Sequence, residues 1–265
     1  MSEALPALVC RGLTKTFNRD LPESRPALDG VDLSVAPGDF LVLIGGNGAG
    51  KSTLLNSIAG TVQPDQGALL IAGRDVTALA PHKRASLVTR VFQDPMAGTA
   101  AAMTIEENLA IAERRGQAHR ARSLLTQDGR ARYRDWLAEF GLGLEDRLES
   151  PVALLSGGQR QALSLLMAVV SQPVLLLLDE HTAALDPRTA HRVMEATMRA
   201  VTERRLTTLM VTHNMSQAIA TGNRLIMMDA GRIRFDIGGA EKAALTPDVL
   251  VERFQIDNDR MRLEH

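Results

Sequence analysis

The chain has 265 residues and a hydrophobic content of 45%, enough for the core of one or two globular domains. A net charge of −1 and an aromatic content of 3% give neither electrostatic nor base-stacking support for a nucleic-acid-binding protein. The single cysteine, Cys10, excludes an internal disulfide, and we expect it to be a small buried apolar residue.

No apolar run approaches the roughly 18 residues that span a bilayer, so we expect no transmembrane segment. The N-terminus lacks a basic region followed by a long apolar stretch, which argues against a signal peptide and for a cytoplasmic protein. The final residues, Leu263-Glu264-His265, are typical of a cloning scar that leads into a histidine tag. We therefore expect the natural chain to end near Arg262.

The first elements in chain order are short strands at 8–16 and 28–35, separated by a polar loop with two prolines. The next strand, 40–44, is a continuous apolar run of the kind found in buried parallel sheets. It leads into a segment that fits G-x-x-x-x-G-K-[ST] and opens a helix. The segment consists of Gly45, Gly46, Asn47, Gly48, Ala49, Gly50, Lys51 and Ser52, and Thr53 follows it as a further candidate nucleotide-binding residue.

This loop predicts a site for the phosphates of a nucleoside triphosphate with Mg²⁺. Gly45, Gly48 and Gly50 allow a tight turn whose N–H groups point inward, and the following helix adds its positive end. Lys51 supplies a charge for the outer phosphates, and the Ser52 hydroxyl is a hard oxygen suited to Mg²⁺. A glycine-rich turn without a ligand is the alternative, but the strand, loop and helix that the motif requires are all present.

Strands at 68–72 and 88–92 follow, after which the composition becomes helix-prone and polar. Thr104 and Glu107 fit a capping box that opens a helix, and Trp136, Leu137 and Phe140 recur at helical spacing. We expect one domain over 1–262, with a core of 1–96 and 173–262 and an inserted helical subdomain at 97–172. The apolar positions of this subdomain are expected to form its own small core.

Residues 113–134 hold seven arginines against two carboxylates. Two readings remain open for this segment. It is either a solvated helix face or a surface that lies near anionic lipid headgroups.

Four leucines at 175–178 predict a strand buried on both faces that ends in Asp179 and Glu180. Ligands bind at such strand ends in open α/β sheets. Asp179 is placed to hold the Mg²⁺ shell, and Glu180 to polarise a water against the γ-phosphate. His213 follows a later strand, 206–212, and would bond the γ-phosphate and hold that water. No pair of the other histidines has zinc-ligand spacing.

Helices at 187–204 and 214–222 alternate with strands at 206–212, 224–229 and 233–237, and Thr246 with Pro247 opens a last helix. This alternation predicts a parallel sheet covered by helices. A further helix begins at Ser156-Gly157-Gly158-Gln159, where Ser156 and Gln159 fit a capping box. No local acid neutralises this helix start, so it is a candidate anion site. Because the chain already has a phosphate loop, we expect it to meet the γ-phosphate held by a second subunit.

The order of these motifs resembles the nucleotide-binding subunit of ATP-binding cassette (ABC) transporters, with LSGGQ as the most specific motif, and the resemblance covers nearly the whole chain. The resemblance implies a phosphate-loop NTPase core, an N-terminal antiparallel β-subdomain and an inserted α-helical subdomain. It places Phe17 under adenine, Gln93 at Mg²⁺ and at the link to the membrane partner, and Asp186 at the dimer seam. Asp186 also precedes Pro187, so it can cap the next helix.

The resemblance further implies an ATPase that works as a head-to-tail dimer of identical copies with ATP and Mg²⁺ sandwiched between them. Its partners would be integral-membrane permeases and, indirectly, a periplasmic or extracellular substrate-binding protein, with no nucleic acid. Such a subunit would lie peripherally on the cytoplasmic face of the bacterial inner membrane.

One position departs from the family pattern, because His181 stands after Asp179-Glu180 where most members have proline. This variant resembles importer ATPases that are paired with branched-chain-type permeases, some assigned to tryptophan or tyrosine uptake. The first hypothesis is therefore the ATPase of a solute importer. The alternatives are an exporter ATPase for lipids or lipoproteins, a soluble ABC ATPase that acts on nucleic acid or ribosomes, and a non-hydrolysing regulator.

Overall fold

The computed structural model describes residues 5–18, 20, 24–116, 125–141, 143–246 and 248–250. The chain divides into two compact units. The first unit contains the described residues up to Ala78 and those from Thr207 onward, and the second runs from Leu79 to Leu206. The predicted helical insertion, 97–172, lies within the second unit, and its exact bounds stay a prediction.

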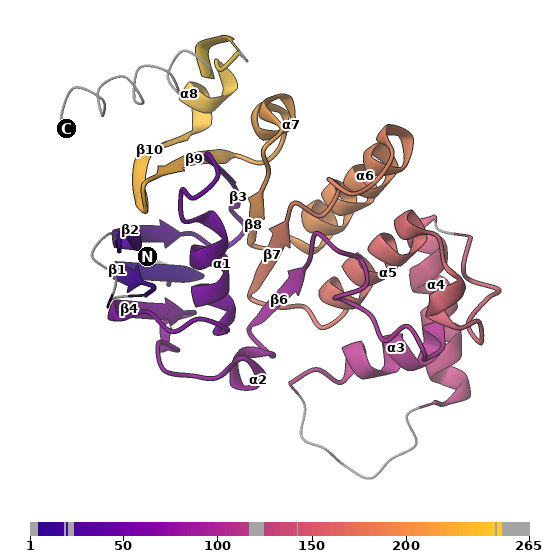
Figure 1. The fold of residues 1–265 in the computed structure, drawn as a ribbon. Coiled ribbons are helices and arrows are strands. Elements are labelled where there is room, and N and C mark those ends of the chain that lie inside the picture. The colour runs from indigo at the N-terminus through magenta and orange to yellow at the C-terminus, as the bar shows by residue number, and fades with distance from the viewer. Residues whose placement is uncertain are drawn as a thin grey trace. The chain divides into compact units, whose positions relative to one another are not determined.

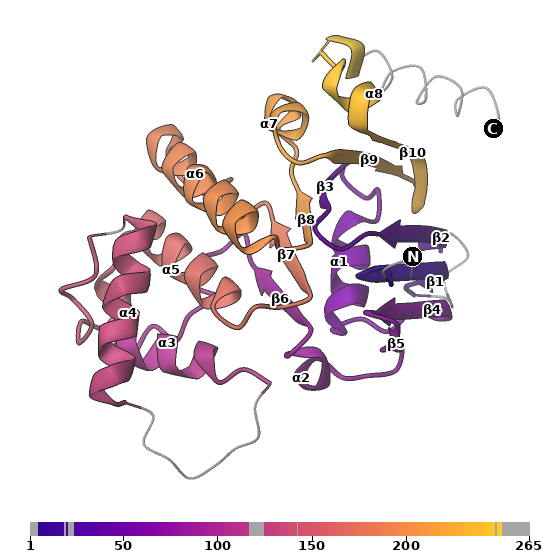
Figure 2. The same ribbon diagram turned by 180° about the vertical axis from the view of Figure 1, so that it is seen from behind.

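The N-terminal part of the first unit is an antiparallel sheet with strand order β2-β1-β4-β5 (Figure 2). Its strands are β1 (Leu8–Thr16), β2 (Pro26–Val35), β4 (Gln66–Ile71) and β5 (Arg74–Asp75). Leu8 lies opposite Val35 on one neighbour and opposite Ile71 on the other, and all three side chains are fully buried. Burial of these apolar side chains explains the alternating pattern of β1. The predicted antiparallel β-subdomain is confirmed.

Cys10 lies on β1 and is 2% exposed, as predicted. Burial raises the pKa of its thiol to about 12, and the nearby Asp32 charge adds to the shift. Only the thiolate is nucleophilic, so iodoacetamide at about pH 8 should label folded protein roughly 10³-fold more slowly than the urea-unfolded chain. Mass spectrometry of a labelling time course measures both rates, and equal rates would contradict the buried position.

The first unit also contains a second set of strands in the order β10-β9-β3-β8. β3 (Phe40–Ile44) is buried along its whole length and pairs in parallel with β8 (Thr208–Val211) and β9 (Arg224–Asp229). The edge strand β10 (Arg232–Gly238) pairs antiparallel to β9. The helices of this unit are α1 (Lys51–Ala59), α7 (Met215–Ala220) and α8 (Gly239–Ala243) (Figure 1). The register of β3 with β8 and β9 confirms the predicted parallel sheet, and an apolar run buried on both faces is typical of such strands.

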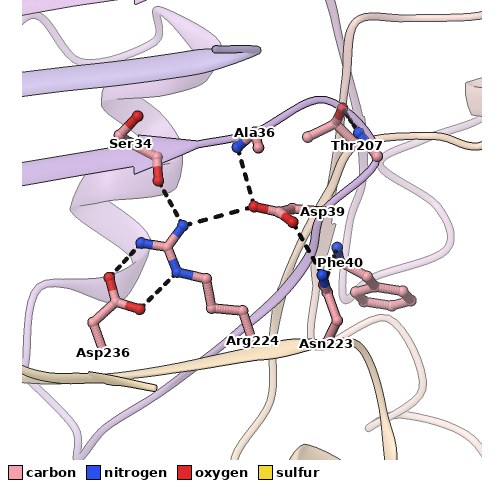
Figure 3. A network of polar contacts seen from close by, with 9 residues as sticks. Ser34, Ala36, Asp39, Phe40, Thr207, Asn223, Arg224 and Asp236 are labelled. Atoms are coloured by element: carbon pink, nitrogen blue, oxygen red, sulfur yellow. Dashed lines mark hydrogen bonds and ion pairs between the residues drawn. The ribbon is translucent and has the colours of Figure 1, made fainter. Parts of the chain in front are cut away.

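A polar network fixes the start of β3 (Figure 3). Asn223 accepts a bond from the Phe40 N–H at 2.7 Å and donates to Asp39 at 3.0 Å. Arg224 forms a two-pronged ion pair with Asp236 on β10 and donates to the Ser34 carbonyl of β2 at 2.6 Å. These bonds join β2, β9 and β10 to the turn before β3, and so fix the strand that carries the phosphate loop.

The second unit begins with α2 (Pro81–Arg84) and has two parallel strands, β6 (Val88–Val91) and β7 (Leu175–Asp179). Its longer helices are α3 (Ile105–Glu113), α4 (Gln127–Phe140), α5 (Gly157–Val169) and α6 (Pro187–Arg204), with a short 3₁₀ turn, η1 (Val152–Leu154). Tyr133, Leu137 and Phe140 on α4 are buried, whereas Trp136 is half-buried, with its ring centroid 5.6 Å from that of Tyr133. Because α3, α4 and α5 also contact one another, these helices of the predicted subdomain form their own apolar core, as predicted.

The predicted helix caps are confirmed. Thr104 with Glu107 and Ser156 with Gln159 each form a reciprocal capping box. The Thr246 hydroxyl accepts the Val249 N–H at 3.3 Å, whereas Pro247 and the predicted tag residues lie outside the described residues.

The arginine-rich segment is described except for residues 117–124. Arg130 pairs with Glu106 at 2.7 Å, and Arg132 pairs with Glu113 at 2.8 Å. These intramolecular pairs favour the reading of the segment as a solvated helix face. In the part of the chain that the structure describes, no helix has both the length and the apolar character needed to cross a bilayer.

Candidate nucleotide site

The phosphate loop follows the carboxyl end of β3 and turns into α1, as the motif predicts. Three of its glycines have positive φ: Gly45 (153°), Gly48 (80°) and Gly50 (99°). A Cβ at Gly45 would lie 2.2 Å from the Met228 carbonyl oxygen, and one at Gly50 would lie 2.3 Å from that of Ala27. Both distances are far below van der Waals contact, so only glycine fits at these two positions.

Lys51, the first residue of α1, is 9% exposed. Its Nζ donates to the carbonyl oxygens of Gly45 at 2.7 Å and Gly46 at 2.9 Å. These bonds hold the ammonium over the loop, at the positive end of α1, where no first-turn acid opposes it. Ser52 follows and is exposed. The loop thus combines a fixed cation, a hydroxyl and a helix N-terminus, which together suit a polyphosphate.

His213 lies at the same sheet edge as the phosphate loop. β8 runs parallel to β3 with Val211 opposite Leu43, so both strands end on one side. The Thr212 hydroxyl donates to Gln217 at 2.6 Å and accepts from the Asn214 N–H at 3.1 Å, and Asn214 caps α7. Hydrogen bonds thus fix both neighbours of His213, Thr212 and Asn214. The side chain of His213 itself is exposed.

Phe17 follows β1 and is 46% exposed. The Lys15 ammonium lies 5.5 Å from the centroid of its ring. A large exposed aromatic ring is available for stacking on a flat ligand.

In the second unit, β6 and β7 also end on one side, because Val91 lies opposite Leu178 in parallel register. Gln93 follows β6, and Asp179 ends β7. The Asp179 carboxylate forms an ion pair with Arg90 of β6, and both side chains are less than one fifth exposed. Sequence analysis missed Arg90, although a charged residue inside a predicted strand was a visible signal.

Glu180 has a left-handed backbone with φ of 46°, which is rare for a residue other than glycine. Its carbonyl accepts the Ala183 N–H at 2.9 Å, which stabilises the turn. Strained backbone of this kind persists where the surrounding structure fixes it, and it concentrates at functional sites.

The next residue, His181, is 2% exposed and anchors this turn to α6. The Thr197 hydroxyl donates to the Val193 carbonyl at 2.8 Å, so its one proton is already used. The His181 Nε2, 3.0 Å from the same hydroxyl, must then be the donor, which fixes the tautomer. Burial lowers the pKa of His181 to about 4, so the ring is neutral. The sequence identified the unusual residue but not this contact.

The signature segment begins α5. Gln159 N–H donates to the Ser156 hydroxyl, and Ser156 N–H donates to the Gln159 side chain, each at 3.2 Å. No acid lies in the first turn. Arg160 donates to the carbonyls of Val152, Ala153 and Leu155, which fixes the loop before the helix. Ser156 and Gly157 are exposed.

Gly158 permits a close approach between α5 and α6. A Cβ at this position would lie 2.1 Å from the Thr189 methyl carbon, whereas one at Gly157 would lie 3.8 Å from Leu185. Gly158→Ala should therefore lower the free energy of unfolding by about 1–3 kcal/mol, and Gly157→Ala should have little effect. Urea denaturation measures both values. Thr189→Ser removes the clashing methyl, so it should recover most of the loss, and equal effects of the two alanine variants would contradict the proposed clash.

Asp186 caps α6 by accepting the Thr189 N–H at 3.1 Å, and bonds from Thr189 hold the pKa of its carboxyl below the usual value. The capping role is confirmed, and the side chain is exposed. The structure thus places the phosphate loop, Phe17 and His213 in the first unit. Gln93, Asp179, Glu180, Asp186 and the signature segment lie in the second.

Three of the predicted residues carry hard oxygen atoms of the kind that Mg²⁺ prefers. In the described residues, no group of three or more His, Cys, Asp or Glu side chains could hold a metal ion by itself. Ser52, Gln93 and Asp179 instead offer a hydroxyl, an amide and a carboxylate oxygen. Mg²⁺ is usually bound through one or two carboxylates plus substrate phosphates and water, so each of these oxygen atoms is a suitable ligand.

The chain is similar to ATP-binding proteins of transport systems. The family model described as "ABC transporter" matches residues 28–183. A tyrosine transport ATP-binding protein of Clostridioides difficile (strain R20291) is 40% identical over 248 residues, which cover 94% of this chain and 98% of the relative. An aliphatic sulfonates import ATP-binding protein of Burkholderia cenocepacia (strain HI2424) is 36% identical over 87% of this chain and 63% of the relative.

Solved structures of ATP-binding cassettes have the same fold as this chain. A nucleotide-free ATP-binding cassette from an ABC transporter has a TM-score of 0.73 and 26% identity, with 90% of this chain and 93% of that chain covered. A dimeric ATP-binding cassette in a post-hydrolysis state, bound to ADP and Pi, also has a TM-score of 0.73 and 26% identity. That alignment covers 87% of this chain and 98% of the other.

Proposed function

The chain belongs to the ABC transporter ATP-binding family, and from this premise we propose that it drives uptake of an aromatic amino acid, with the predicted site residues in the roles argued below. The chain is an ATPase subunit of an importer, in line with relatives that are named as import ATP-binding proteins. The observation that carries the ATP-binding role is the phosphate loop, in which two glycines admit no Cβ and Lys51 lies over the loop.

The first unit would bind the nucleotide. Backbone N–H groups from Gly46 to Thr53 and the Lys51 ammonium would hold the phosphates, because they combine a helix N-terminus with a fixed positive charge. The exposed Phe17 ring would stack on adenine. Its exposure and its position after β1 support this role.

Hydrolysis would use the predicted residues of the phosphate loop and those that follow β6, β7 and β8. Ser52, Gln93 and Asp179 would hold Mg²⁺, which neutralises phosphate charge when bound. The Glu180 carboxylate would accept a proton from the attacking water, and His213 would hydrogen-bond the γ-phosphate and orient that water. The strained backbone of Glu180 and its anchored neighbour His181 support a carboxylate that is fixed before substrate arrives.

A second copy of the chain would complete each ATP site. Ser156, Gly157, Gly158 and Gln159 open a helix without a first-turn acid, and Asp186 is exposed at the start of α6. These groups would meet the γ-phosphate held by the other copy. The dimeric relative bound to ADP and Pi supports a working dimer.

The remaining partners follow from the family. Integral-membrane permeases would receive the movement through the segment at Gln93, and a substrate-binding protein would deliver the solute. The protein would lie on the cytoplasmic face of the bacterial inner membrane. The tyrosine transport relative and the variant His181 support an aromatic amino acid as cargo. Relatives named as import proteins favour this direction over the exporter and nucleic-acid alternatives.

ATP affinity tests the assignment of the phosphate loop. Lys51→Ala should weaken ATP binding about tenfold or more, because it removes the charge-assisted bonds to the outer phosphates. Lys83→Ala, at an exposed lysine of α2, is the matched control and should bind like the parent. Isothermal titration calorimetry measures both affinities. Equal affinity in Lys51→Ala would contradict the assignment.

Uptake of labelled amino acids tests the cargo. Cells with the complete transporter should accumulate tyrosine or tryptophan, and cells with the Lys51→Ala subunit should not. Normal ATP binding by the subunit without uptake of either amino acid would reject the cargo and leave the ATPase assignment intact.

A further inference from the structure

The Asp179 carboxylate already has a cationic partner within its own unit. The Arg90 guanidinium donates to its Oδ2, and the two side chains are 13% and 17% exposed. Arg90 also lies over the Phe92 ring, with 4.8 Å from the guanidinium carbon to the ring centroid. An aromatic face on one side and a carboxylate on the other give this guanidinium a defined position.

The backbone explains why the pair forms. Arg90 lies opposite Leu177 in the parallel register of β6 and β7, so Asp179 is two residues beyond its partner. Phe92 is the residue after the end of β6, two positions from Arg90, and side chains two positions apart along an extended chain lie on the same side. The pair is thus built into the sheet edge that also carries Gln93 and Glu180.

From this pair we infer that Arg90 competes with Mg²⁺ for the Asp179 carboxylate, and so sets the concentration of Mg²⁺ that the nucleotide-bound protein requires. The inference rests on the proposed role of Asp179 in holding Mg²⁺. A guanidinium in contact with a carboxylate and a divalent cation at the same group repel each other, and the repulsion is weakly screened where both side chains are mostly buried. Binding of Mg²⁺ at Asp179 therefore requires the ion pair between Arg90 and Asp179 to weaken.

The contact with Phe92 would still hold the guanidinium when its contact with Asp179 weakens. The Phe92 carbonyl accepts the Gln161 side-chain amide of α5 at 2.9 Å, and Gln93 is the next residue. Arg90 is a positioning residue that acts through Asp179.

Metal affinity measured without turnover tests this inference. The protein is saturated with a non-hydrolysable ATP analogue in metal-free buffer, and Mn²⁺, as a spectroscopic substitute for Mg²⁺, is titrated by electron paramagnetic resonance. Arg90→Met retains side-chain length without charge, and should bind Mn²⁺ about tenfold or more tightly than the parent, the size of effect that a contacting charge produces. Arg90→Gln, which retains hydrogen-bond donors, should act in the same direction. Arg90→Lys retains the charge and should stay near the parent.

The affinity for the analogue in metal-free buffer should be unchanged in all three variants, which separates loss of folding from a change in metal binding. Mn²⁺ affinity that is equal or weaker in folded Arg90→Met and Arg90→Gln would overturn the inference, because the pair would then serve the fold alone. Asp179→Asn identifies failure of the underlying proposal. If that variant binds Mn²⁺ as the parent does, Asp179 is not a metal ligand.

Discussion

Glu180→Gln should lower the rate of ATP hydrolysis by a factor of about 10² or more, the size of effect expected when a general base is lost. The amide has nearly the shape of the carboxylate but cannot accept the proton of the attacking water. ATP affinity should stay close to that of the parent, since the phosphates are held by the loop around Lys51. Steady-state ATPase assays and nucleotide titrations measure the two effects.

The strained backbone provides a second test of this assignment. Glu180 has a φ of 46°, a conformation that glycine adopts readily. Glu180→Gly should therefore preserve the turn and retain stability while it abolishes the same activity. A Glu180→Gln variant that hydrolyses ATP at the parent rate would show that another group activates the water.

His181 should make the fold sensitive to acid. Its pKa is lowered by burial from 6.5 to about 4, so the unfolded chain takes up a proton before the folded protein does as the pH falls. The stabilisation is complete above about pH 6.5 and is lost progressively toward about pH 4. At about pH 5 the loss due to this residue should be about 2 kcal/mol in the free energy of unfolding.

Urea denaturation with a chelator at about pH 7.5 and about pH 5 measures this loss. His181→Gln is the matched variant, because its amide can donate to Thr197 but does not titrate. Other titrating groups are common to both proteins, so the acid-induced loss should be smaller in the variant by about 2 kcal/mol. The same pH dependence in both proteins would show that the His181 ring is not buried in its neutral form.

Local sequence signals predicted much of the fold because each depends on neighbouring residues. The capping pairs Thr104–Glu107 and Ser156–Gln159 and the glycines of the phosphate loop have fixed spacings and local causes, and the structure contains them as expected. The buried strand 175–178 could be read from its leucines alone.

Three features could not be read from the sequence, because they depend on contacts between distant residues. Arg90 contacts Asp179, which lies 89 positions later in the chain, because β6 and β7 pair in parallel at these residues. His181 reaches Thr197 only because α6 folds back over the turn. The need for glycine at position 158 comes from Thr189 on another helix. Each depends on packing, and a sequence read locally does not contain it.

The most direct test of a site completed by a second copy is the mass of Glu180→Gln in solution, measured by size-exclusion chromatography with light scattering. We predict a monomer without nucleotide and a dimer that retains ATP when ATP and Mg²⁺ are present, since bound nucleotide bridges the two copies. Adding Ser156→Arg should abolish the dimer without weakening ATP binding to the monomer. A protein that binds ATP and Mg²⁺ yet stays monomeric, or a dimer unaffected by Ser156→Arg, would contradict the shared site.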